Sequence, residues 1–157
     1  GTGPRGGEGI DEILKFALVA NLKAAVTLKD SRNYLFFPRT PEGKQAAKDY
    51  FARLKERKTG RDKRISLQAR LAQVKAIRAA GRSEPDDLSR ITQPVLVANG
   101  DHDLMVASSH SADMARRLPN ARLTIYPDSG HGGVFQHHEE FVPAALAFLN
   151  GSGETPR

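Results

Sequence analysis

The first half of the chain has apolar residues at the spacing of amphipathic helices. Three segments show this pattern, with apolar side chains recurring about every 3.6 residues. Thr40-Pro41-Glu42 marks the start of the middle segment, because the hydroxyl can cap the first turn and proline has no N–H that needs a partner there. The pattern predicts helices over residues 10–28, 41–57 and 65–80, the last ended by Gly81.

Each predicted helix has an apolar side suited to packing. In the middle helix, Tyr50, Phe51 and Leu54 are expected to be buried. The run Tyr34-Leu35-Phe36-Phe37-Pro38 is too aromatic for a solvated loop, so it either packs beneath the helices or lines a substrate pocket. Packing is favoured, because aromatic side chains bury so much area. The apolar positions of the other two helices are Ile13, Leu14, Leu18, Leu22 and Val26, and Leu67, Leu71, Val74 and Ile77.

The pattern changes after a cluster of turn-forming residues at 84–89. Residues 95–98 are apolar on both sides, as in a strand between two helical layers, and residues 123–126 form a second short apolar run. Between them, residues 108–118 predict a crossover helix. With a closing helix over residues 139–149, this order predicts an α/β fold whose two strands run parallel.

The closing helix has its own expectations. Pro143 falls in its first turn or just after, where the backbone N–H has no intrahelical partner to lose. The residues expected to face inward are Phe141, Val142, Leu146 and Leu149.

Composition adds limits to this fold. The 157 residues are 39% hydrophobic and 27% charged, as in a globular domain, and no cysteine is present to form a disulfide, a thiolate metal site or a nucleophile. No apolar run approaches the roughly 18 residues that cross a bilayer. We therefore expect a soluble, cytoplasmic protein without a membrane partner, although an upstream segment could have carried a targeting signal.

The net charge of +6 is unevenly distributed. Residues 1–93 hold 20 Lys and Arg against 11 Asp and Glu, whereas residues 94–157 hold 4 against 7. The basic residues peak in 55–64, a run that contains acids and no aromatic side chain on which bases could stack. A solvated helix end and loop is therefore favoured over a polyanion site, and nucleic acid is not the expected partner.

Candidate chemistry follows the two predicted strands. Asp103 comes after the first strand and His131 just past the second, and the carboxyl ends of adjacent parallel strands lie close together. An Asp there could accept the Nδ1 proton of the His and stabilise the imidazolium that forms when Nε2 takes a nucleophile's proton. Asp101 is the alternative acid, although its place suggests that it caps the turn. Gly130 and Gly132 would leave room for a substrate beside the ring.

The remaining histidines are predicted to be surface or capping residues. A zinc site built from them with Asp101 and Asp103 is a weaker alternative, because no His-Glu-x-x-His or comparable spacing is present. No cofactor and no metal are expected. These histidines are His102, His110, His137 and His138.

The motifs resemble those of the α/β-hydrolase fold family. Residues 91–149, with Pro-Val-Leu-Val-Ala-Asn-Gly-Asp-His-Asp and Pro-Asp-Ser-Gly-His-Gly, look like the C-terminal third of that fold. The resemblance implies that Asp103 and His131 are the catalytic acid and base and that the substrate is a small acyl compound such as an ester or amide. It also implies four segments: 1–9, a glycine-rich loop leaving a missing core strand; 10–85, a helical cap; 86–150, the C-terminal core segment; and 151–157, a flexible tail.

The chain departs from the family in one respect. The family's nucleophile lies on a Gly-x-Ser-x-Gly turn before the acid, and no serine here is flanked in this way. Ser129 is too near His131 along the chain to attack a substrate over the ring. We therefore expect the chain to lack the nucleophile by truncation, to be inactive alone, and to associate with a chain carrying the other strands or with itself. The serines before Asp103 are Ser31, Ser66, Ser83 and Ser89.

Overall fold

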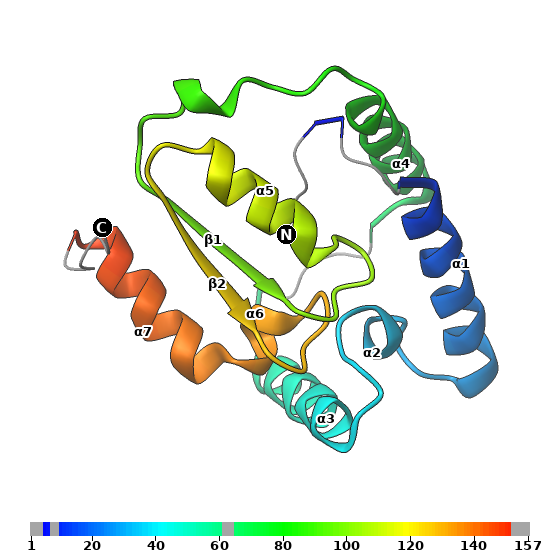
Figure 1. The fold of residues 1–157 in the computed structure, drawn as a ribbon. Coiled ribbons are helices and arrows are strands. Elements are labelled where there is room, and N and C mark those ends of the chain that lie inside the picture. The colour runs from blue at the N-terminus through cyan, green and yellow to red at the C-terminus, as the bar shows by residue number, and fades with distance from the viewer. Residues whose placement is uncertain (1–4, 7–9, 61–64, 152–157) are drawn as a thin grey trace.

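The computed structural model describes residues 5–6, 10–60 and 65–151. Most of the predicted glycine-rich loop and tail, and part of the basic run 55–64, lie outside these residues. Figure 1 shows four helices leading into a two-stranded sheet with further helices around it. The elements are α1 (Ile10–Thr27), α2 (Arg32–Leu35), α3 (Pro41–Glu56), α4 (Leu67–Gly81), the 3-10 helix η1 (Leu88–Arg90), β1 (Val95–Gly100), α5 (Ser108–Arg117), β2 (Ala121–Tyr126), α6 (Gly133–Gln136) and α7 (His138–Leu149).

The predicted parallel sheet is confirmed. β1 and β2 pair in parallel, from Val95 opposite Ala121 to Gly100 opposite Tyr126. Helix α5 connects them and contacts both strands. Because the strands end side by side, the loops that follow them meet at one edge of the sheet (Figure 1).

Helix α3 begins as predicted. The Thr40 hydroxyl accepts a hydrogen bond from Gly43 N at 3.0 Å, and Pro41 is the first helical residue. The predicted packing of the aromatic run is confirmed, because Phe37 is buried in one cluster with Ala47 and Tyr50. Phe36 and Phe51 pack against this cluster. Leu54 was wrongly predicted as buried: it is 39% exposed.

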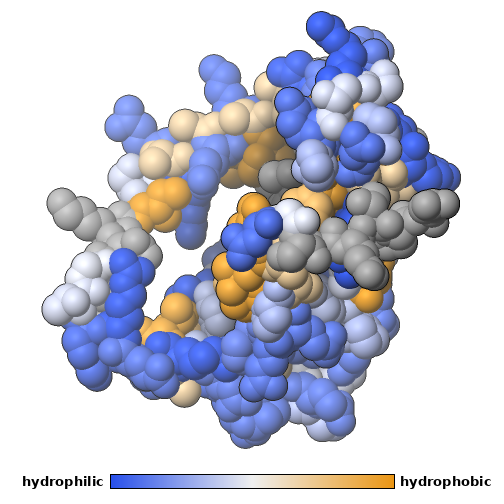
Figure 2. All heavy atoms as spheres, turned by 90° about the vertical axis from the view of Figure 1, so that its left-hand side faces the viewer, coloured by the Kyte–Doolittle hydropathy of each residue, from blue (hydrophilic) through white to orange (hydrophobic). Residues whose placement is uncertain are grey.

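The prediction for the inward side of the closing helix is largely wrong. Val142, Leu146 and Leu149 are exposed, and only Phe141 is partly buried. Within the described part of the chain, no element covers this side of α7. Figure 2 shows the face on that side of the molecule as hollowed, with hydrophobic side chains beside the hollow. Pro143 is the sixth residue of α7 rather than a residue of its first turn, so it removes one hydrogen bond inside the helix.

Several large apolar side chains of α1 and α4 are also exposed. Helix α1 buries its small residues Ala20 and Ala24, while Leu18 and Leu22 are exposed. Packing through alanines allows a close helix contact but leaves the larger side chains of the helix outside. Helix α4 begins after Ser66, whose hydroxyl accepts a hydrogen bond from Ala69 N, two residues later than predicted.

None of the described helices combines the length and the hydrophobicity that a membrane span needs.

Gly100, at the end of β1, gives a direct test of this packing. A Cβ built there would lie 2.2 Å from the carbonyl oxygen of Ser129, and backbone atoms at that distance have to shift. We expect Gly100→Ala to lower the free energy of unfolding by about 3 kcal/mol or more, measured by urea denaturation. The control is Gly151→Ala, where no atom lies within 4 Å and only the positive φ of 69° opposes a side chain. Equal losses in the two variants would contradict the close approach.

Candidate active site

The loop after β1 is held by a buried asparagine. Asn99 donates from Nδ2 to the carbonyl oxygen of Val106 at 2.8 Å and to the Ser111 hydroxyl at 3.1 Å. Its Oδ1 accepts a hydrogen bond from Gly100 N at 2.8 Å. Asn99 thereby connects β1, the loop and helix α5. Its buried amide is fully hydrogen-bonded only when all three partners are in place. The apolar-strand pattern did not single out Asn99, although a polar residue within such a strand is the signal that could have done so.

Asp103 is the carboxylate that this loop presents. Its side chain is 0% exposed, and Oδ1 accepts hydrogen bonds from Met105 N at 2.7 Å and Val106 N at 2.9 Å. Its Oδ2 lies 2.9 Å from Nδ1 of His131. A carboxylate can only accept, so this contact requires that His131 carries its proton on Nδ1. The structure thus brings together the two residues that the sequence singled out.

His131 lies in a tight loop after β2. Its side chain is 16% exposed, and among the described residues only Nδ1 of the ring makes a hydrogen bond. Nε2 is therefore left with its lone pair once Nδ1 holds the proton. The space beside Gly130 and Gly132 is not open as predicted, because Phe36 fills it: a Cβ at Gly132 would lie 2.8 Å from Cβ of Phe36.

Asp101 caps a turn, but it is the turn after β2 and not, as its position suggested, the turn in which Asp101 itself lies. Its carboxylate accepts hydrogen bonds from Asp128 N and Ser129 N, each at 3.1 Å, and contacts His102 Nδ1 at 2.6 Å. Burial alone would raise the pKa of Asp101, but these hydrogen bonds outweigh it and hold the pKa below its usual value. Asp101 thus supports the left-handed backbone of Asp128, whose φ is 43°.

The other candidate residues have structural contacts. Ser129 is fully buried, and its hydroxyl donates to the carbonyl oxygen of Tyr126 at 2.9 Å. The ring of His137 stacks on Tyr126 with 4.9 Å between centroids, so it is not a plain surface residue. In the described part of the chain, no three His, Cys, Asp or Glu side chains are grouped so that they could hold a metal ion.

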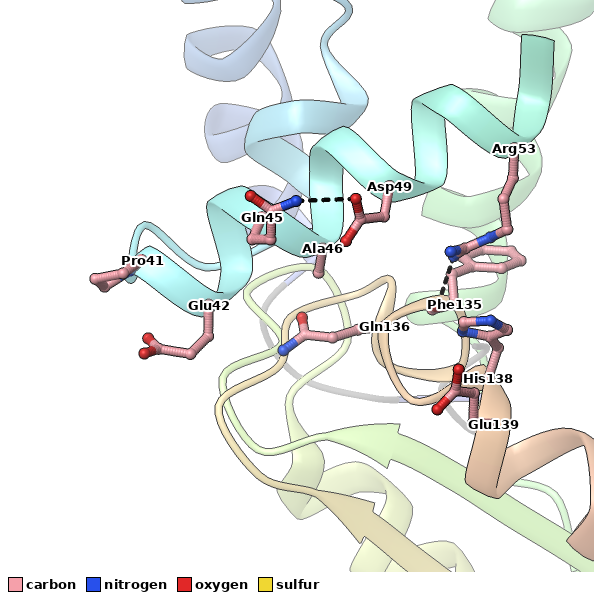
Figure 3. A pocket seen from close by; sticks show the side chains of 10 residues that line it. All are labelled: Pro41, Glu42, Gln45, Ala46, Asp49, Arg53, Phe135, Gln136, His138 and Glu139. Atoms are coloured by element: carbon pink, nitrogen blue, oxygen red, sulfur yellow. Dashed lines mark hydrogen bonds between the residues drawn. The ribbon is translucent and has the colours of Figure 1, made fainter. Parts of the chain in front are cut away.

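A groove of about 590 Å³ lies between α3 on one side and the end of α6 and the start of α7 on the other. Figure 3 shows Gln45 and Asp49 hydrogen-bonded along α3, and Gln136 and His138 on the opposite side. Neither Asp103 nor His131 lines this groove. The groove is therefore distinct from the acid–base pair. Phe135, which lines the groove, stacks on Phe36 with 6.0 Å between ring centroids.

The fold is shared with a known protein family. The profile of the family described as "alpha/beta hydrolase fold" matches residues 14–138. This chain belongs to the alpha/beta hydrolase fold family.

Individual relatives match it over part of their length. The chain is similar to the carbamate hydrolase RutD of Caulobacter sp. (strain K31), with 46% identity over 66 residues, which are 42% of this chain and 25% of that protein. It is also similar to a non-heme chloroperoxidase of Streptomyces lividans, with 43% identity over 65 residues, 41% of this chain and 24% of the relative. A solved alpha/beta hydrolase from Chitinophaga pinensis superposes with a TM-score of 0.80 at 29% identity, over 95% of this chain and 54% of that one. This chain therefore spans about half of the Chitinophaga protein.

The capping role of Asp101 predicts a pH-dependent loss of stability. Asp101→Asn keeps only one acceptor oxygen for two backbone donors, so we expect the free energy of unfolding to fall by about 1–2 kcal/mol at pH 7. Because folding lowers the pKa of Asp101, its contribution is complete above the unfolded pKa of about 3.9 and is lost as pH falls through the lower folded pKa. Urea denaturation at pH 7 and in steps below pH 4 measures this. A difference between the two proteins that does not shrink with acid would contradict the role.

Proposed function

We propose that this chain supplies the acid, the base and the cap of a serine-type hydrolase acting on an ester, an amide or a related acyl compound. The observation that carries the proposal is the buried Asp103 carboxylate, which holds Nδ1 of His131 at 2.9 Å while two backbone amides occupy its other oxygen. This arrangement fixes the tautomer of the imidazole and leaves Nε2 as a base.

In the proposed reaction, a serine hydroxyl gives its proton to Nε2 of His131 while its oxygen bonds to the acyl carbon. The Asp103 carboxylate stabilises the imidazolium that forms. The imidazolium then returns the proton to the leaving alcohol or amine as the acyl bond breaks. Water repeats these steps to release the acid and restore the serine.

The serine of this reaction is proposed to lie on polypeptide outside residues 1–157. Within the described residues, the serine nearest His131 in sequence is Ser129, and its hydroxyl is buried and donates to a backbone carbonyl. Several other serines have capping or structural hydrogen bonds. Ser66 caps α4, Ser83 bonds the backbone of Ala79, and Ser111 is a partner of Asn99.

The exposed apolar side of α7 supports an association of residues 1–157 with the polypeptide that carries this serine. Val142 and Leu146 lie on α7, and Leu123 and Ile125 lie on β2; each is at least a third exposed. Apolar surface of this extent is removed from water when a further layer packs on it. We propose that this layer belongs to the polypeptide that carries the remaining strands of the sheet, and that self-association is the alternative.

A second candidate activity is acyl transfer to hydrogen peroxide at the same site. The similarity to a chloroperoxidase of Streptomyces lividans favours it, since that relative matches at 43% identity over 65 residues. Similarity to a methyl ester esterase of Nitrosomonas europaea, 34% identical over 56 residues, favours ester hydrolysis. Asp103 and His131 would act as acid and base with either acyl acceptor, water or hydrogen peroxide.

Replacing the pair tests the function. In the polypeptide translated from the complete reading frame, we expect Asp103→Asn to lower kcat for a nitrophenyl ester about 10⁴-fold, because an amide stabilises the wrong tautomer of His131. We expect His131→Ala to reduce it at least as much. The measurement is steady-state release of nitrophenol.

The matched control is His102→Gln, since His102 directly precedes Asp103 and its side chain is exposed. It should keep kcat within about twofold, as surface substitutions usually do. Turnover that survives His131→Ala would sink the proposed function.

A further inference from the structure

The turn that leads from α2 to α3 lies against the loop that carries His131. The carbonyl oxygen of Phe36 accepts a hydrogen bond from Gly132 N at 2.8 Å. Four residues later, the Thr40 hydroxyl donates to Oδ2 of Asp128 at 2.8 Å. Two hydrogen bonds therefore attach this turn to both ends of the histidine loop, 128–132.

The two backbones are as close as glycines permit. A Cβ at Gly130 would lie 2.9 Å from the carbonyl oxygen of Phe36, and one at Gly132 would lie 3.0 Å from the same atom. Because the two backbones already approach this closely, the loop has no space to shift toward the turn. The conformation of the histidine loop is thus set jointly by β2 and by Phe36.

The side chain of Phe36 also meets the imidazole itself. Its ring centroid lies 5.5 Å from that of His131, with 64° between the planes. The imidazole is bonded to Cβ and hydrogen-bonded at Nδ1, so the freedom that remains is rotation about χ1 and χ2 of His131, which breaks the hydrogen bond. A ring packed against its side removes this freedom.

Phe36 is itself held by aromatic neighbours. It stacks on Phe135 with 6.0 Å between centroids and 13° between planes, and it contacts Tyr50 at 6.2 Å. Tyr50 is buried in the cluster with Phe37. Phe36 is therefore held by aromatic side chains of both α3 and α6.

We propose that Phe36 is a positioning residue for His131, which holds the imidazole in the orientation that its hydrogen bond to Asp103 requires. It acts through His131 and not on the substrate, and its catalytic meaning rests on the function proposed above. The aromatic packing around α3 is in this way linked to the orientation of the His131 imidazole.

The first test follows the Nδ1 proton of His131 in the full chain labelled with ¹⁵N-histidine. We expect Phe36→Leu to raise the rate at which this proton exchanges with water about tenfold or more, because the imidazole then leaves its hydrogen bond more often. The exchange rate is measured by NMR with saturation of the water signal. No turnover is needed for this readout.

The matched control is Phe51→Leu. Phe51 packs against the same aromatic cluster, with its ring 5.2 Å from that of Tyr50, but it makes no ring contact with His131. We expect this variant to lose similar stability in urea and to keep the exchange rate within about twofold. Equal exchange rates in the two variants would overturn the proposal, and so would the absence of a slowly exchanging Nδ1 proton in the parent chain.

Turnover separates this proposal from the function on which it rests. In the complete polypeptide, Phe36→Leu should lower kcat about tenfold and leave KM within about twofold, because the base is misplaced while the substrate contacts remain. If the exchange rate responds but no variant has activity to lose, the positioning role stands and the proposed function fails. If activity depends on His131 but neither measurement responds to Phe36→Leu, the positioning role fails alone.

Discussion

The hydrogen bond between Asp103 and His131 depends on how closely two strand ends approach each other. Beyond the last pair of the sheet, Asp101 N donates to the carbonyl oxygen of Tyr126 at 3.0 Å, and His102 N donates to that of Ser129 at 2.9 Å. The parallel pairing thus continues past the strands into both loops. Gly100 permits this, since any side chain there would collide with Ser129. Residues 28 positions apart are brought within 2.9 Å as a result.

The buried carboxylate of Asp103 couples the order of the loop after β1 to that of the histidine loop. Removing a charge from water is costly unless it is paired and hydrogen-bonded, and Asp103 meets that demand with two loop amides and one imidazole. Loss of any of these donors leaves the buried Asp103 carboxylate with one hydrogen bond fewer. The loop after β1 and the histidine loop are therefore ordered together. Phe36 lies almost a hundred residues earlier in the chain, and its ring packs against that of His131.

The sequence was sufficient to predict the longer helices, the two strands and the proximity of Asp103 to His131, but not the short helices α2, η1 and α6, because the predicted features depend on local signals. Hydrophobic spacing predicts α1, α3 and α5 closely, and polar residues after two apolar strands point to Asp103 and His131. Periodicity shows which side of a helix is apolar but not whether anything covers it, so Leu54 and Leu146 were misplaced. The contact of Phe36 with His131 joins distant segments. Its only sequence signal was an aromatic run too apolar for solvent, which indicates packing without naming a partner.

The most direct test of the account is the position of one proton. We propose ¹⁵N NMR of His131 at a pH where the imidazole is neutral, in the parent chain and in Asp103→Asn. We expect a proton on Nδ1 in the parent and on Nε2 in the variant, because an amide nitrogen at position 103 can donate to Nδ1. A parent protonated on Nε2, or the same tautomer in both proteins, would contradict it.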